Sequence, residues 1–287
     1  MDALTTADGR RLAYGRVGSG PTLVCHPGGP GFSSLYLGEL GGLGEQLELV
    51  LLDPRGTGGS DPPGDPRAFA IDDYVSDLEE LRAHLGLERM LLLGHSHGGV
   101  VATAYAARHR TRVERLILAS TAAHFAGEQN AAMENAMEAR SGESWYEDAR
   151  AAFEQEISGE FSGDAEFTAV CLRMMPFYFA RYGEAERAWT QSLAGDRLNA
   201  AAARLWEKEI FEHFDLRPAL AQITAPALVI TGERDFITGP GSVRELEQGI
   251  ADVETVILPG TGHLIFVEAP EAFREAVLSF LGAEVTA

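Results

Sequence analysis

Short apolar runs alternate with amphipathic segments at both ends of the chain. Runs of strand length end at strong turn residues, and apolar residues at helical spacing mark 71–85 before Gly86. The strand-like runs are 12–16, 21–25, 47–52, 91–93, 113–120, 226–231 and 253–258, and a closing amphipathic helix is predicted at 270–280. This alternation predicts an α/β fold with a mainly parallel sheet covered by helices on both faces. The run at 12–16 is short and amphipathic, so we expect it at a sheet edge.

The middle of the chain has a different pattern. Between residues 124 and 215 the strand-like runs disappear, and helical patterns rich in Ala, Glu and Arg carry scattered aromatic residues. We therefore expect an α/β core formed by residues 1–123 and 216–287, with a helical cap at 124–215 over the carboxyl ends of the strands.

The run Leu91–Leu93 leads directly into Gly94-His95-Ser96-His97-Gly98, and a helix-like segment of small residues follows. A strand, a Gly-x-Ser-x-Gly turn and a helix together form the nucleophile elbow of hydrolases. Glycine at both turn positions avoids clashes, and Ser96 then stands at the positive end of a helix. The alternative is a glycine-rich turn that carries an ordinary surface serine.

Two further chemically useful residues follow the last two strands. Asp235 comes after 226–231 and His263 after 253–258, so both should lie at the same sheet edge as Ser96. The order Ser, Asp, His is that of the α/β-hydrolase triad. His263 would act as the base for Ser96, and Asp235 would orient the imidazole.

An oxyanion hole is expected beside the serine. The loop His26–Gly31 contains two prolines and three glycines, which suits a rigid loop at a strand end. We expect the backbone N–H of Gly29, with Gly28 as second choice, to donate to the oxyanion together with the N–H of His97. The side chains of His95 and His97 are expected to pack against neighbouring loops, since an elbow directs them away from Ser96.

A second glycine-rich loop, 53–60, follows the run 47–52. It lacks the Lys-Ser/Thr ending of a phosphate-binding loop. We expect Asp53 and Arg55 to brace the loops beside the oxyanion hole through hydrogen bonds.

The composition of the chain limits the classes of partner that it can bind. The chain has 287 residues and a formal net charge of −20, which disfavours nucleic acid and anionic membranes. No apolar run approaches the ~20 residues of a membrane helix, and residues 1–5 do not resemble a secretory signal, so a cytoplasmic enzyme is expected. Cys25 and Cys171 are expected to be free and buried. No metal ligand set or cofactor motif is evident, and the oligomeric state is open.

The chain resembles the α/β-hydrolase superfamily over essentially its whole length. Within it, Gly28–Gly31 and the motif from Asp53 to Ser60 are similar to those of the proline iminopeptidase group of serine peptidases, although Pro27 stands where the group has histidine. The resemblance implies cleavage of an N-terminal residue from a peptide or amide. It also implies recognition of the free amine by cap glutamates, for which Glu207 and Glu209 are the candidates. The alternative for both is a solvated helix surface.

We therefore expect a serine hydrolase that acts on a small molecule or short peptide, most simply an aminopeptidase or amidase. A carboxylesterase or lactonase would need the same triad, so it remains the second hypothesis. A hydrolase-fold protein that binds without catalysis is the third.

Overall fold

The computed structural model of the protein describes residues 1–125, 128–211 and 213–282. Eight strands within them form one sheet, in the spatial order β1-β2-β4-β3-β5-β6-β7-β8. The strands are β1 (Asp2–Thr5), β2 (Arg11–Gly18), β3 (Thr22–His26), β4 (Glu48–Leu52), β5 (Met90–His95), β6 (Val113–Ala119), β7 (Ala227–Gly232) and β8 (Val253–Leu258). Neighbours from β4 to β8 pair in parallel, and β1 and β2 join antiparallel at one end. The prediction of a mainly parallel α/β sheet is confirmed.

Helices cover both faces of this sheet. They are α1 (Ile71–His84), α2 (His97–Arg108), α8 (Arg217–Leu220), α9 (Pro240–Gly249), α10 (Ile265–Glu268) and α11 (Pro270–Leu281), with short η1 (Ser34–Leu37) and η2 (Leu43–Glu45). Successive strand residues point to opposite faces of the sheet. On β6, Leu116 and Leu118 belong to the core with α1, α2, α8 and α9. Ile117 and Ala119 belong to the core on the other face, with α10 and α11. Both cores are buried, and they hold the strand ends in place.

The position of β2 corrects one expectation. The run at 12–16 does not lie at a sheet edge, because β1 pairs with it on the outer side through a register that includes Ala3 and Ala13. The short sequence Asp2–Thr5 has too little pattern to be recognised as a strand by itself, and the pairing with β2 stabilises it.

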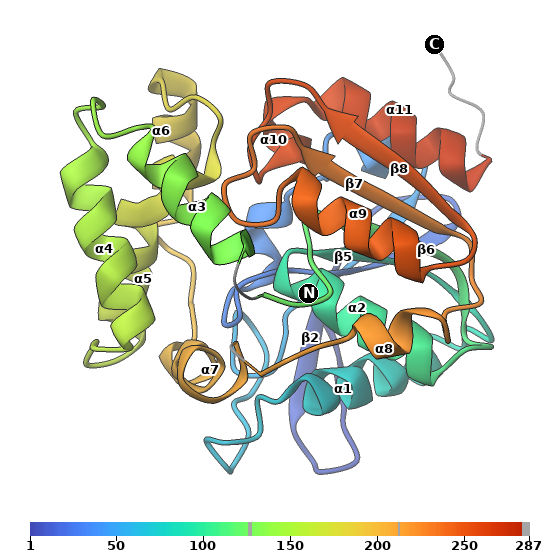
Figure 1. Ribbon diagram of the computed structural model, residues 1–287. Helices are drawn as coiled ribbons and strands as arrows, with labels where there is room; N and C mark the ends of the chain where they lie inside the picture. Colours follow the sequence, from blue (N-terminus) through green and yellow to red (C-terminus); the bar gives the residue numbers. More distant parts are fainter. Residues whose placement is uncertain (126–127, 212, 283–287) are drawn as a thin grey trace.

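A helical segment connects β6 to β7. It contains α3 (Glu128–Glu138), α4 (Tyr146–Ser158), α5 (Asp164–Met174), η3 (Met175–Tyr178), α6 (Glu184–Ser192), α7 (Ala200–Leu205) and η4 (Trp206–Ile210). Figure 1 shows α3 to α6 gathered on one side of the sheet-bearing part, with α7 below them. The segment has its own apolar cluster, which includes Met137, Phe153 and Phe177.

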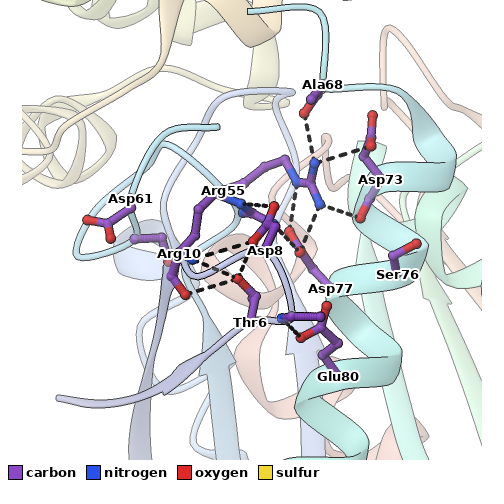
Figure 2. Close-up of polar contacts among 12 residues, drawn as sticks. Thr6, Asp8, Arg10, Arg55, Asp61, Ala68, Asp73, Ser76, Asp77 and Glu80 are labelled. Atoms are coloured by element: carbon purple, nitrogen blue, oxygen red, sulfur yellow. Dashed lines mark hydrogen bonds and ion pairs between the residues drawn. The ribbon is translucent and has the colours of Figure 1, made fainter. Parts of the chain in front are cut away.

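The loop after β4 is braced by buried charges. Asp53 accepts hydrogen bonds from the backbone N–H groups of Ser34 and Gly59, at 2.9 and 2.8 Å. Arg55 donates to both carboxylate oxygens of Asp77 on α1, at 2.7 and 2.8 Å, and Arg10 donates to the same carboxylate at 3.0 Å. Figure 2 shows the part of this network around Arg10, Arg55 and Asp77, in which Arg55 reaches across to α1. Asp53 therefore braces the loop after β3, as expected, whereas Arg55 holds its own loop against α1 and not against the loop after β3.

Over the residues that the structure describes, no helix is both long and apolar enough to span a bilayer.

Candidate active site

Ser96 stands at a sharp turn between β5 and α2. Its backbone has φ 56° and ψ −124°, a conformation that non-glycine residues rarely adopt. A side chain at Gly94 would overlap the carbonyl of Gly98, and one at Gly98 would overlap the carbonyl of His26. Glycine at both positions therefore permits the close approach of β5, α2 and the loop after β3, which is the geometry of a nucleophile elbow.

Asp235 and His263 meet at the same sheet edge. Nδ1 of His263 lies 2.9 Å from Oδ2 of Asp235, and both side chains are buried. Asp235 Oδ1 also accepts the N–H groups of Ile237 and Thr238, each at 3.0 Å. Burial alone would raise the pKa of Asp235, but His263 and the hydrogen bonds from Thr238 outweigh burial and lower it. A carboxylate that stays ionised holds His263 with Nδ1 protonated, which leaves Nε2 as the basic nitrogen.

Ser96 and His263 line the same small cavity. No hydrogen bond joins the Ser96 hydroxyl to His263 among the described residues, and such contacts commonly tighten only when substrate binds. The three residues named from the sequence are thus brought together at one edge of the sheet, as a serine nucleophile, a base and an orienting carboxylate require.

Two residues with unpaired backbone donors lie beside Ser96 in the described part of the chain. Gly29 and His97 both line the larger cavity beside the serine. Across the described residues, neither N–H has an acceptor, whereas the N–H of Gly28 is committed to the hydroxyl of Tyr36 at 2.6 Å. This favours Gly29 over Gly28 as the partner of His97.

Two cavities adjoin the serine. The larger has a volume of about 290 Å³ and the smaller about 60 Å³. Both are lined by Gly29, Ser96, Glu156 and Tyr178, so they meet at Ser96.

Comparison with known proteins identifies the family. The family model for the alpha/beta hydrolase fold matches residues 21–270. The chain belongs to the α/β-hydrolase family. It is 27% identical to the proline iminopeptidase PfmaB of Pestalotiopsis fici over 96% of this chain and 97% of that protein. It is 28% identical to a proline iminopeptidase of Levilactobacillus brevis, over 93% of this chain and 90% of that protein. The crystal structure of the enol-lactonase of Burkholderia xenovorans LB400 superposes on this chain with a TM-score of 0.69 and 25% sequence identity. The match covers 98% of this chain and 100% of the enol-lactonase chain. The protein is thus a hydrolase similar to the proline iminopeptidase group.

The two glutamates named from the sequence lie in different places in this hydrolase. Glu207 lines the larger cavity and is half-buried, but Glu209 does not line it. The Glu209 side chain is 55% exposed and lies 3.9 Å from Arg67. Residues two apart on a helical turn face opposite sides, so only one of the pair can face the cavity. The expectation for Glu209 is corrected accordingly.

Two other glutamates of the larger cavity were missed from the sequence. One of them, Glu134 on α3, is paired with Arg150 at 2.6 Å. Glu156 on α4 lines both cavities, and its negative charge helps to raise the pKa of Glu207. No local motif marks Glu156 among the many glutamates of this segment, because its role depends on how α4 packs over the sheet edge.

The helical segment also contacts the loop that carries His263. The N–H of His263 donates to the carbonyl of Tyr178 at 2.8 Å. Glu268 accepts the N–H groups of Ala180 and Gly262, at 2.8 and 2.7 Å. His263 is therefore held between the sheet edge and the inserted segment.

The remaining histidines near the elbow pack as expected. His97 contacts Trp206, with ring centroids 4.6 Å apart, and burial lowers the pKa of His97 to about 3. The part of the chain that the structure describes contains no cluster of three or more His, Cys, Asp or Glu side chains suited to a metal ion. Cys25 and Cys171 are free and buried, as predicted.

Proposed function

We propose that this hydrolase uses Ser96, His263 and Asp235 to remove an N-terminal amino acid from an amide or short peptide. The observation that carries the proposal is a pair of carboxylates, Glu156 and Glu207, in the wall of the cavity beside Ser96. Within the described residues, no basic side chain pairs with either one. Both are half-buried. A carboxylate that is partly removed from water and has no partner is costly, and an ammonium group of the substrate would offset that cost.

The electrostatics of the pair support a cationic ligand. Burial raises the pKa of Glu207, and the nearby charge of Glu156 raises it further. Burial also raises the pKa of Glu156. An ammonium group between them would favour ionisation of both. Oδ1 of Asn130 lines the same cavity and has no hydrogen-bond partner in the described part of the chain, so it supplies a third acceptor.

The chemistry follows from the geometry. The Ser96 hydroxyl attacks the carbonyl carbon and its proton passes to Nε2 of His263. The oxyanion accepts hydrogen bonds from the N–H groups of Gly29 and His97. His263 then gives the proton to the leaving nitrogen, the amide bond breaks, and an ester links the acyl group to Ser96. Water attacks this ester, its proton passes to His263 and then to Ser96, and the amino acid is released.

The experiment is ammonia release from alaninamide and phenylalaninamide, compared with their N-acetylated forms and with short-chain esters. We expect turnover of the free amines, its loss on acetylation, and its loss in the Ser96→Ala variant. The wild-type protein should react with a fluorophosphonate probe at Ser96. Absence of both turnover and labelling would overturn the proposal and support a protein that binds without catalysis.

A second candidate is hydrolysis of a small ester or lactone. Most of the larger cavity wall is apolar, and Glu134 in that wall is neutralised by its ion pair with Arg150. Protonation of Glu156 and Glu207 would remove the remaining charge of the wall, which suits a neutral acyl group. The similarity to an enol-lactonase points the same way. Turnover of esters with no response to a free amine would favour this candidate.

A further inference from the structure

The two cavities that meet at Ser96 differ greatly in size. The larger, at about 290 Å³, has nearly five times the volume of the smaller, at about 60 Å³. A substrate cleaved at Ser96 must extend its acyl part into one and its leaving group into the other. The residues that line each cavity indicate which one receives the acyl part and which one receives the leaving group.

The smaller cavity receives the leaving group. His263 lines this cavity and not the larger one. Because the base must return its proton to the leaving atom, that atom has to lie on the side of His263. The cavity ends against buried sulfur-bearing side chains, those of Cys171, Met174 and Met175.

The larger cavity receives the acyl part. His97, whose N–H is the proposed oxyanion donor, lines only this cavity, and so does Glu207. The carbonyl oxygen and the free amine of an aminoacyl group are both on the acyl side of the scissile bond. The amino-acid side chain therefore extends along the same wall.

That wall is broad and apolar. It is formed by large side chains from the core and from the inserted segment, namely Phe125, Met133, Phe153, Trp206 and Phe211. A small acyl side chain would leave much of this surface without contacts, whereas an aromatic or long aliphatic one would cover it.

We infer that the substrate is an aminoacyl amide with a large apolar acyl residue and a small leaving amine, not a prolyl peptide. This inference rests on the proposed function and specifies its substrate. The best substrates are amides of ammonia or of a very short amine, with an aromatic or long aliphatic amino acid on the acyl side.

The first test varies the acyl residue with ammonia as the constant leaving group. We expect kcat/KM for phenylalaninamide to exceed that for prolinamide and alaninamide by about tenfold or more. The reason is that even one extra methylene group bound in an apolar pocket can raise kcat/KM by about tenfold. The second test keeps phenylalanine and varies the leaving group. Phenylalaninamide should then be cleaved better than Phe-Phe or the bulky phenylalanine anilide, again by about tenfold.

Two variants change one cavity each. Val100→Phe narrows the larger cavity, and we expect it to lower the ratio of phenylalaninamide to alaninamide turnover. Cys171→Ala enlarges the smaller cavity, and we expect it to raise the ratio of Phe-Phe to phenylalaninamide turnover. Cys25→Ala is the matched control, because Cys25 is equally buried and lines neither cavity. Ratios within one variant are insensitive to a loss of folded protein.

The outcomes separate the two proposals. If free amines are cleaved but prolinamide or long leaving groups are preferred, the cavity assignment is overturned and the aminopeptidase proposal stands. If no free amine is cleaved, the aminopeptidase proposal itself fails. Unchanged ratios in both Val100→Phe and Cys171→Ala would also contradict the assignment.

Discussion

The hydroxyl of Tyr36 lies 2.7 Å from Nδ1 of His95. Tyr36 also accepts the N–H of Gly28, so its single proton must go to His95, and Nε2–H of His95 then donates to the carbonyl of His263 at 3.1 Å. Burial, with the charge of His263 next, lowers the pKa of His95 to about 3, so the imidazole remains neutral. One chain of hydrogen bonds thus connects the loop at Gly28, the elbow and the loop that carries His263.

Removal of the Tyr36 hydroxyl should therefore affect chemistry more than substrate binding. In Tyr36→Phe, the Gly28 N–H and His95 both lose a partner, and the Gly28–Gly29 loop loses its fixed position. We expect kcat to fall by about 10- to 100-fold, the scale of a misplaced oxyanion donor, with little change in KM. Steady-state kinetics across pH measure this.

Tyr105→Phe is the matched control. The Tyr105 hydroxyl donates to Glu79 of α1 at 2.6 Å, and neither residue lines a cavity beside Ser96. Equal losses of kcat in the two variants would show that Tyr36 has only a structural role.

Glu207 and Glu209 provide a matched pair within η4. Glu207→Gln removes a negative charge from the cavity wall, and we expect KM for free-amine substrates to rise about 10- to 100-fold, equivalent to about 1.5–3 kcal/mol for a charge-assisted hydrogen bond. Glu209→Gln should leave KM unchanged, since its side chain is exposed. A similar KM in both variants would exclude Glu207 from amine binding.

The same substitution should increase stability in a pH-dependent way. The pKa of Glu207 is raised from its ordinary 4.5, so the folded state keeps this proton to a higher pH than the unfolded state does. The free energy of unfolding therefore falls as pH rises above the ordinary value. Glu207→Gln should remove this loss and gain at least about 1.4 kcal/mol at about pH 8, the free energy of one pKa unit, and nothing near pH 4.

Urea unfolding of wild type, Glu207→Gln and Glu209→Gln at both pH values measures this effect. A gain of equal size at the two pH values would mean that the charge of Glu207 is not its source.

The buried network around Asp77 should be important for stability. Asp77→Asn leaves Arg55 and Arg10 with a neutral partner in a buried site, and we expect a loss of about 3–5 kcal/mol in the free energy of unfolding. Asp72→Asn on the same helix is the control, because that ion pair with Arg108 is exposed and should contribute under about 1 kcal/mol. Urea midpoints of the two variants test the difference, and similar midpoints would contradict it.

Local pattern in the sequence was enough to predict much of the site. Ser96, Asp235 and His263 each follow a strand-like run, and parallel strands bring their carboxyl ends to one edge. Glycines at the elbow mark a turn that larger residues cannot make. These signals are short-range, so neighbouring residues carry them.

Only the tertiary structure decides which glutamates line the cavities. Glu156 lies far from Glu207 in the chain, and nothing near it in sequence distinguishes it from the glutamates on the outer face of the same segment. Which face of α4 and η4 turns to the cavity depends on how each packs over the sheet edge. Likewise, β1 becomes a strand through its pairing with β2, and the sizes of the two cavities beside Ser96 depend on packing between the core and the inserted segment. Burial and long-range contact determine these features, and a linear pattern does not encode them locally.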